Sequence, residues 1–437
     1  MQKPSMPLPV SRSYVRWSMA LLVAINLVNF IDRFVLAAVE KPIREAFFAP
    51  DDQDAKFWTG MLSTMFLLSY MFAAPLFGWL ADRSSRWLWV GVGVIVWSVA
   101  TGGTGLAPTF TLLLITRAFV GIGEAAYNPV APTMIADLYP VEQRGAKLSL
   151  FYVAIPVGSA IGFVLGGFVG GMWGWRAAFG VVVLPGIILG ILALLMRDPP
   201  RQKGHGSIRT AGDSGRRKYA ELWRTPSYVI NTAGMTAMTF ALGGIAFWMP
   251  TYVHEFRQAG SLEDVNMIFG GITVFTGLTA TLSGGKLCDV LTKRFPGAYF
   301  WVSGVSMLLG FPCFIATLFV PFKPFPWAWG CIFVAEFCLF FSTGPTNAIT
   351  ANVTRPAIRA SAFAINIFVI HLLGDVISPP LIGKITGWAN GNMNAGFMAV
   401  SVAILISGVF WLCGSKFLAR DTAQAQSQDD ETGQPMP

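Results

Sequence analysis

Residues Arg117 to Pro140 read RAFVGIGEAAYNPVAPTMIADLYP, a segment with the length and apolarity of a membrane-spanning helix and with two opposite charges inside it. At about 100° of rotation per helical residue, Arg117, Glu124 and Asn128 fall within roughly 60° of one another, together with Gly121. This polar stripe must face protein or water, because an ionisable side chain at bilayer depth costs at least about 2.5 to 3.5 kcal/mol. We therefore interpret the stripe as a candidate functional site.

The composition is that of a polytopic membrane protein. The 437 residues are 54% apolar and 12% charged, whereas soluble domains carry about 25% charged residues. Mean hydropathy is +0.57. No alternation of apolar and polar residues over segments of about ten runs through the chain, so we expect helices and not a β-barrel. Twelve apolar segments are long enough to cross about 30 Å of hydrocarbon, at 17–40, 57–81, 87–106, 109–138, 147–171, 175–196, 227–252, 265–289, 298–320, 326–350, 361–386 and 395–418.

One long polar connection separates six spans from the next six. We predict an N-terminal six-helix bundle at 1–196, a basic cytoplasmic linker at 197–226, a C-terminal six-helix bundle at 227–420 and a disordered cytoplasmic tail at 421–437. Basic residues are concentrated on the side that holds both termini, so both termini are expected in the cytoplasm, at the inner membrane if the source is bacterial.

The net charge of +8 follows from this orientation in the membrane, and we expect no nucleic-acid partner. No Cys or His cluster has the spacing of a metal site, so neither a metal nor another cofactor is expected. The expected partners are a small-molecule substrate, protons and membrane lipids, and the chain is expected to work as a monomer.

Short motifs recur in the two halves. GWLADRSSR at 78–86 closes the second span, and GKLCDVLTKR at 285–294 closes the eighth, with Gly and Asp four residues apart in both. EQRGAKLS at 142–149 similarly matches AIRASAFA at 357–364. Internal repetition of this kind predicts two similar six-helix halves.

The first of these motifs resembles the marker of the major facilitator superfamily, which has Gly, three residues, Asp, Arg and further basic residues after the second span. Ser85 departs from the pattern, where the superfamily usually has Gly. The resemblance implies an all-α membrane fold of twelve helices in two pseudo-symmetric bundles. It also implies a cytoplasmic gate, in which Gly78 lets two helices approach and Asp82 faces a helix N-terminus or an arginine. The residues assigned to this gate are Gly78, Asp82, Arg83, Arg86, Arg144 and Asp289.

Three stretches resemble the Spinster transporters more closely. They are IDRFVLAAVEKPI at 31–43, the long run from GIGEAAYNP to FVLGG at 121–167, and FAINIFVIHLLGDVISPPLIG at 363–383. Spinster-like proteins are associated with export or salvage of lysolipids and sphingoid phosphates, often with proton coupling. The resemblance also implies that the first, fourth, seventh and tenth spans line a central cavity.

The first span carries a second polar stripe, formed by Asn26, Asn29 and Arg33, with Asp32 beside it. At 1.5 Å per residue, Asp32 and Arg33 lie about 12 Å deep, level with Arg117. These charges would gate the carrier or bind a substrate head group; alternatively, Asp32 forms a fixed ion pair with Arg117 or Arg33 that joins helices. Glu124 lies near mid-membrane, where its protonation would weaken its pairing with an arginine and bias a two-state motion. Alternatively, Glu124 is a hydrogen-bond acceptor for a substrate head group or within the structure.

In the second half, His371 and Asp375 are spaced to share a helix face, and Glu336, Thr343 and Asn347 form another stripe. Packing is the alternative role for each set. The proposed proton-coupling residues are therefore Glu124, Asp32, His371 and Asp375, and the proposed substrate-binding or gating residues are Arg117, Arg33, Asn26, Asn29, Asn128, Glu336 and Asn347.

Glycines recur every four residues on the fifth span, at 158, 162, 166 and 170. Small residues at this spacing let helix backbones approach closely, and we expect them at a seam where the halves slide.

Two transporter functions remain open. One is export or uptake of an amphiphilic, lysolipid-like anion by proton-coupled alternating access, and the other is proton-coupled uptake of a small organic anion or sugar acid. An intramembrane enzyme is the third class considered, and the sequence contains no HExxH, GxSxG or Walker motif to support it. We therefore expect no enzymatic activity.

Overall fold

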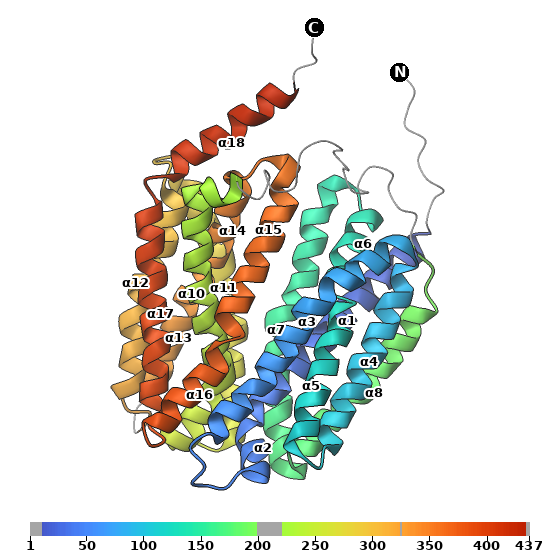
Figure 1. Cartoon of the computed structure of the whole chain (residues 1–437), viewed down its shortest axis with the longest axis vertical. Coiled ribbons are helices and arrows are strands. Elements are labelled where there is room, and N and C mark those ends of the chain that lie inside the picture. Colours follow the sequence, from blue (N-terminus) through green and yellow to red (C-terminus); the bar gives the residue numbers. More distant parts are fainter. Residues whose placement is uncertain (1–10, 199–220, 324–325, 434–437) are drawn as a thin grey trace. The chain divides into compact units, whose positions relative to one another are not determined.

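The computed structural model describes residues 11–198, 221–323 and 326–433, and the regular structure in these ranges is helical (Figure 1). The first half contains α1 (Arg12–Ala38), α2 (Glu40–Phe47), α3 (Ala55–Arg83), α4 (Arg86–Leu106), α5 (Phe110–Ala125), α6 (Ala131–Leu138), α7 (Val141–Trp173) and α8 (Trp175–Leu194). The second half contains α10 (Pro226–Thr251), η1 (Tyr252–Phe256), α11 (Leu262–Leu291), α12 (Ala298–Phe319), α13 (Trp327–Phe341), α14 (Thr343–Asn352), α15 (Pro356–Ile370), η2 (His371–Asp375), α16 (Ser378–Trp388), α17 (Met393–Gly414) and α18 (Leu418–Gly433), where η marks a π-helical turn. Most of the predicted linker, residues 199–220, lies outside the described residues.

Within the described ranges, eleven helical segments are long and apolar enough to cross a membrane. The remaining predicted span, 109–138, is divided into α5 and α6. Pro129 explains the division, because it has no N–H to donate to the carbonyl of Ala125, the last residue of α5, and its ring crowds that carbonyl. The predicted all-α membrane fold is confirmed, with its fourth span broken after Ala125, one residue beyond Glu124.

The chain forms two compact units. Unit 1 comprises Met1–Phe48, Met61–Arg209 and Leu262–Gly270, and unit 2 comprises Ala49–Gly60, Thr210–Ser261 and Gly271–Pro437. Residues 49–60 therefore group with the second half of the sequence, and residues 262–270 group with the first half. The candidate residues on α1 and α5 all lie in unit 1.

The glycine ladder on α7 packs against α1, within unit 1. A Cβ atom added to Gly158 would lie 2.8 Å from the carbonyl oxygen of Leu27, and one added to Gly162 would lie 2.7 Å from that of Ile31. The expected seam between the halves is therefore wrong for this ladder. A different face of α7, offset by one residue, meets the segment 262–270, where Gly167 contacts Asn266.

Gly162→Leu is expected to destabilise unit 1 severely, because the new side chain would overlap backbone as well as the Phe34 Cβ atom, 2.9 Å from the added Cβ. Adding side-chain atoms to a well-packed contact typically lowers stability by about 1 to 3 kcal/mol, and by more where the backbone cannot move. The measurement is the monodisperse fraction of detergent-purified protein after heating. Gly180→Leu is the matched control, since nothing among the described residues lies within 4 Å of a Cβ at Gly180. Equal loss in both variants would contradict close packing at Gly162.

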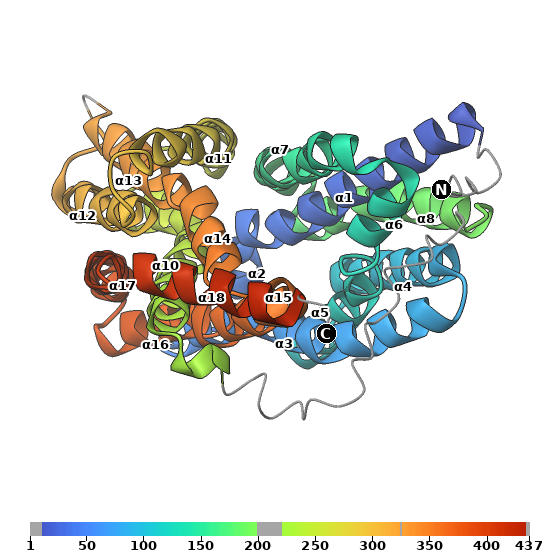
Figure 2. The same ribbon diagram turned by 90° about the horizontal axis from the view of Figure 1, so that it is seen from above.

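The end of the chain differs from the predicted disordered tail. Residues 418–433 form α18, which lies across α10 and α14 in the view of Figure 2. Leu418, Asp421 and Ala425 are spaced to share one face of this helix and are buried. The Asp421 carboxylate accepts a 2.9 Å hydrogen bond from the backbone N–H of Ser227, at the N-terminus of α10. The polar composition was misleading because a single buried face is enough to dock a short helix.

Candidate functional site

Two glycines of α5 bring its neighbours close enough to build a site. A Cβ at Gly121 would collide with the backbone carbonyl of Phe66 on α3, and a Cβ at Gly123 would lie 2.6 Å from the backbone nitrogen of Trp97 on α4. The stretch GIGE therefore places Glu124 where α3 and α4 both approach α5 in backbone contact. Only glycine at these two positions permits this spacing.

Glu124 is paired with Arg33 of α1. The Nε and Nη2 atoms of Arg33 lie 2.7 and 2.6 Å from Glu124 Oε2. Glu124 is fully buried, whereas the Arg33 side chain keeps 21% of its exposure. The sequence placed Glu124 on one stripe with Arg117, but the arginine that forms the ion pair comes from the other helix.

Arg117 is buried close to the carboxylates of Asp32 and Glu124. No residue in the described part of the chain forms a hydrogen bond with its Nε or Nη1 atom. The guanidinium carbon of Arg117 lies 5.4 Å from the ring centroid of Phe66, and that of Arg33 lies 4.8 Å from the same ring. One aromatic ring of α3 thus stabilises both guanidinium groups by cation–π contact.

Two further rings surround Arg33. Its guanidinium carbon lies 5.0 Å from the ring centroid of Phe30 and 5.6 Å from that of Tyr70. Sequence reasoning missed Phe30, Phe66 and Tyr70, since aromatic residues are common in every span. The available signal was the spacing of Phe66 and Tyr70 by four residues, which puts both rings on one face of α3.

Asp32 is held by a hydroxyl group. Thr101 Oγ1 of α4 donates a 2.6 Å hydrogen bond to Asp32 Oδ2, and both residues are buried. The ion pair described for this cluster joins Arg33 to Glu124, and the alternative of a fixed Asp32 pair with Arg117 or Arg33 stays a prediction. Thr101 was not predicted, because a threonine in an apolar span gives no sequence signal.

Thr101→Val is expected to lower the free energy of unfolding by about 1.5 to 3 kcal/mol, the usual worth of a hydrogen bond to a charged group. Valine keeps the shape of threonine but leaves Asp32 Oδ2 without its donor. Thr101→Ser keeps the hydroxyl and serves as the control. Denaturant unfolding in detergent would measure both variants, and a valine variant as stable as wild type would show that the hydrogen bond carries little energy.

The three asparagines of the predicted stripes in unit 1 have different surroundings. Asn26 Nδ2 donates a 2.9 Å hydrogen bond to the carbonyl of Phe151 on α7, which is a structural contact. Asn128 is half-buried near the hydroxyl of Tyr70. Asn29 is fully buried with its carboxamide close to the Glu124 carboxylate, although within the described residues neither of its side-chain polar atoms meets the geometry of a normal hydrogen bond.

In unit 2, the predicted contact between His371 and Asp375 is present. His371 Nδ1 lies 3.0 and 2.9 Å from the two carboxylate oxygens of Asp375. Both residues belong to η2, a π-helical turn, and such turns are frequent at functional sites. A Cβ added to Gly374 would lie 3.0 Å from the carbonyl of Thr236, so glycine lets this wider turn pack on α10.

The predicted stripe on the tenth span is divided. Glu336 is buried and faces α11, where the hydroxyls of Thr273 and Thr276 lie 3.3 and 3.4 Å from its Oε2 atom. Asn347 is exposed and bonds the carbonyl of Thr343 in its own helix. Because α13 ends before Ser342 and α14 begins after it, the helical register does not continue, and Glu336 and Asn347 do not share a site.

At the gate motif, the described contacts of Arg86 lie at the N-terminus of α4. Arg86 Nη1 lies 2.6 Å from Asp137 Oδ2 at the end of α6. The carboxylate of Asp198 accepts hydrogen bonds from the backbone N–H groups of Arg86 and Trp87, at 2.8 and 3.0 Å, and so caps α4 at its positive end. Asp198, which the sequence analysis did not single out, is thus the acid at the N-terminus of α4, and the role predicted for Asp82 stays a prediction.

The other gate residues lie in different surroundings. Arg83 contacts its own helix through the carbonyl and the ring of Trp79, and Arg144 donates a 3.1 Å hydrogen bond to the carbonyl of Tyr139. Asp289 is exposed. Nothing in the described part of the chain lies within 4 Å of a Cβ at Gly78, so the close helix approach expected there is not formed.

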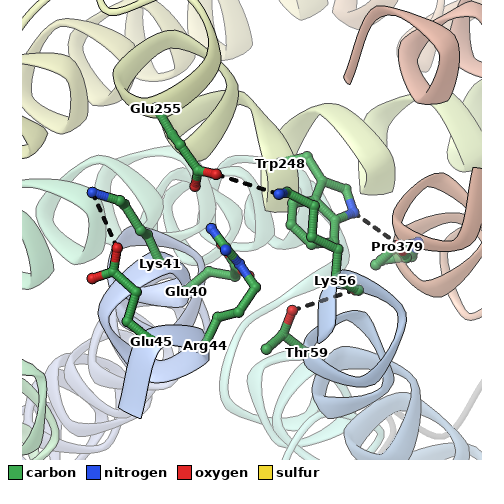
Figure 3. A network of polar contacts seen from close by, with 9 residues as sticks. All are labelled: Glu40, Lys41, Arg44, Glu45, Lys56, Thr59, Trp248, Glu255 and Pro379. Carbon is green, nitrogen blue, oxygen red and sulfur yellow. Dashed lines mark hydrogen bonds and ion pairs between the residues drawn. The ribbon is translucent and has the colours of Figure 1, made fainter. Parts of the chain in front are cut away.

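Within unit 2, ion pairs connect residues 49–60 to later parts of the chain, and one of them is drawn in Figure 3. Lys56 Nζ lies 3.3 Å from Glu255 Oε1, and Lys384 Nζ lies 2.6 Å from Asp54 Oδ1. Beside Lys56 in Figure 3, Trp248 donates a 2.8 Å hydrogen bond to the carbonyl of Pro379. The ion pairs within α2 in the same figure, such as Arg44 with Glu40, belong to unit 1.

Comparison with known proteins agrees with this architecture. Residues 22–379 match the family model of the Major Facilitator Superfamily. Protein spinster homolog 3 of Danio rerio is 34% identical, with 97% of this chain and 90% of the relative covered. The sphingosine-1-phosphate transporter SPNS2 of Mus musculus is also 34% identical, over 94% of this chain and 79% of the relative.

Solved structures show the same fold. A bacterial homolog to the human lysosomal transporter Spinster, described as inward-facing and unoccupied, superposes with a TM-score of 0.78 at 22% identity, covering 96% of this chain and 99% of that chain. The D-xylose-proton symporter superposes with a TM-score of 0.69 at 17% identity, covering 92% and 97% of the two chains. The chain is therefore a multi-pass membrane transporter of the major facilitator superfamily and belongs, within it, to the Spinster family.

Proposed function

We propose that the chain moves an amphiphilic, anionic, lipid-like substrate of the lysolipid or sphingoid type by proton-coupled alternating access of the halves 1–196 and 227–420. The observation that carries the proposal is the buried cluster of unit 1, in which Glu124 is paired with Arg33 while Arg117 lies beside them without an ion-pair partner among the described residues. Similarity to the sphingosine-1-phosphate transporter SPNS2 of Mus musculus supports a lipid phosphate as cargo.

Protonation of Glu124 would supply the coupling. A neutral carboxyl holds Arg33 less strongly than a carboxylate, because charge-assisted hydrogen bonds are roughly twice as strong as neutral ones. Arg33 and Arg117 would then both be available to an anionic head group, which guanidinium groups bind with two parallel hydrogen bonds. Asp32, His371 and Asp375 are the further proton sites of the proposal.

The proposed setting is the cell membrane, with both termini in the cytoplasm and with the chain acting as a monomer. Basic connections on the side of both termini support this orientation.

A ligand panel tests the proposal. The purified chain would be reconstituted in proteoliposomes and assayed for uptake of lysophospholipids, sphingoid phosphates and small organic acids, each with and without an inward proton gradient. Gradient-dependent movement of a lysolipid or sphingoid phosphate is expected. Transport confined to small organic acids or sugar acids would replace the lipid substrate with the alternative cargo, and transport that ignores the gradient would overturn the coupling.

A further inference from the structure

Six buried polar atoms of one cluster in unit 1 have no hydrogen-bond partner among the described residues. They belong to four side chains of α1 and α5: Asn29 Oδ1 and Nδ2, Asp32 Oδ1, Arg117 Nε and Nη1, and Glu124 Oε1. Three are acceptors and three are donors, so the set is balanced in number.

In each of the two carboxylates, one oxygen accepts a hydrogen bond and the other has no hydrogen-bond partner among the described residues. Asp32 Oδ2 is held by Thr101 at 2.6 Å, and Glu124 Oε2 is held by Arg33 at 2.7 Å. Asp32 Oδ1 and Glu124 Oε1 are left open. Asn29 precedes Asp32 by about one helical turn on α1, and its carboxamide lies close to the Glu124 carboxylate, so Asn29 faces the same side of α1 as Asp32 and is also near Glu124.

A bound polar molecule would form hydrogen bonds with these atoms. A buried donor or acceptor without a hydrogen-bond partner is unfavourable, and six such atoms in one cluster favour binding of a polar molecule there. A buried water typically makes about three hydrogen bonds and both donates and accepts, which matches a mixed set of donors and acceptors. A metal ion fits poorly, because Arg33 and Arg117 already place two positive charges against Asp32 and Glu124.

We infer that Asn29 holds water between Asp32 and Glu124 and is the positioning residue of a proton relay that joins the two carboxyl groups. The inference rests on the proposed proton coupling. A protonated Asp32 gives the proton on Oδ1 to the water, and the water gives one of its own protons to Glu124 Oε1. Asp32 is left as a carboxylate, Glu124 becomes the neutral acid, and the water is restored.

The surroundings of the relay are charged on several sides. Asp32 faces Arg117 and Arg33 along with the Thr101 hydroxyl, and Glu124 faces Arg33, Arg117 and Asp32. From α3, the Tyr70 hydroxyl lies near Glu124. The carboxamide of Asn29 donates and accepts at once, so it can fix the orientation of a water that has an acceptor on either side.

Time-resolved infrared spectroscopy tests the relay without a substrate. The full-length protein in lipid nanodiscs is subjected to a proton jump, and the C=O band of the protonated Glu124 carboxyl, assigned with Glu124→Gln, is followed in H2O and D2O. Asn29→Leu and Asp32→Asn are each expected to slow the appearance of this band about tenfold or more, the effect of losing one hydrogen bond of about 1.4 kcal/mol from the barrier. The final amplitude in Asn29→Leu is expected to stay at the wild-type level. Asn29→Ser, whose hydroxyl also donates and accepts, is expected to keep the wild-type rate within about twofold.

Several outcomes overturn the inference. A wild-type rate in Asn29→Leu, or in Asp32→Asn, would remove Asn29 or Asp32 from the path. Equal slowing in Asn29→Ser and Asn29→Leu would reduce Asn29 to a packing residue, and Asn29→Val provides a second apolar variant if the leucine variant does not fold. Absence of any titrating Glu124 band in the wild type would instead overturn the proposed coupling itself, so the two failures are distinguishable.

Discussion

Glu124→Gln is expected to abolish the dependence of transport on the proton gradient. Glutamine has the shape of a protonated glutamate and can still accept a hydrogen bond from Arg33, but it cannot change charge. In wild type, the contact that Arg33 makes with Oε2 at 2.6 to 2.7 Å switches between charge-assisted and neutral. In the variant this contact is permanently neutral, so gradient-driven uptake in proteoliposomes should fall at least about tenfold while exchange at equal pH continues, since a 1.4 kcal/mol change in coupling corresponds to tenfold.

Glu336→Gln is the matched control. Glu336 is also a buried acid of a predicted span, but its neighbours are the hydroxyls of Thr273 and Thr276 and no arginine in the described part of the chain is paired with it. The control should keep its response to the gradient. Loss of that response in Glu336→Gln, together with a normal response in Glu124→Gln, would move the coupling site to unit 2.

Which charged residues lie near Glu124 could be predicted from the sequence, because charged residues are rare in apolar spans. The residue count from the outer boundary placed Asp32, Arg33 and Arg117 at one depth, and the structure brings these residues together with Glu124. The pairing was not predictable. It depends on how α1 is rotated against α5, and that rotation is set by packing, including the contacts of Gly158 and Gly162 with α1.

Uncharged partners were beyond the reach of sequence reasoning. Thr101 and Phe66 resemble dozens of other threonine and phenylalanine residues until α4 and α3 are placed against α5. The break after Glu124 was within reach, since Pro129 stands in the middle of the predicted span. The predicted stripe required a continuous helix across that proline, and Arg117 and Glu124 still share one helix, α5, because both precede the break.

Arg33→Leu is expected to destabilise the protein more than any other change of charge in this cluster. It would leave Glu124, which is fully buried, without the arginine that neutralises it. Removing one partner of a buried ion pair typically costs about 3 to 5 kcal/mol, because the remaining charge keeps its desolvation penalty. Unfolding in denaturant, measured in detergent, should show this loss for Arg33→Leu.

The double variant Arg33→Leu with Glu124→Gln separates this explanation from loss of packing. Removing both charges also removes the uncompensated carboxylate, so the double variant should be more stable than Arg33→Leu alone, with a coupling free energy of at least about 1.5 kcal/mol. The corresponding cycle of Arg117→Leu with Glu124→Gln should give a smaller coupling, since Arg117 forms no ion pair with Glu124 within 4 Å in the described structure. If the Arg117 cycle gave the larger coupling, the carboxylate would be paired with the arginine of its own helix in solution, and the assignment of Arg33 as the switched partner would fail with it.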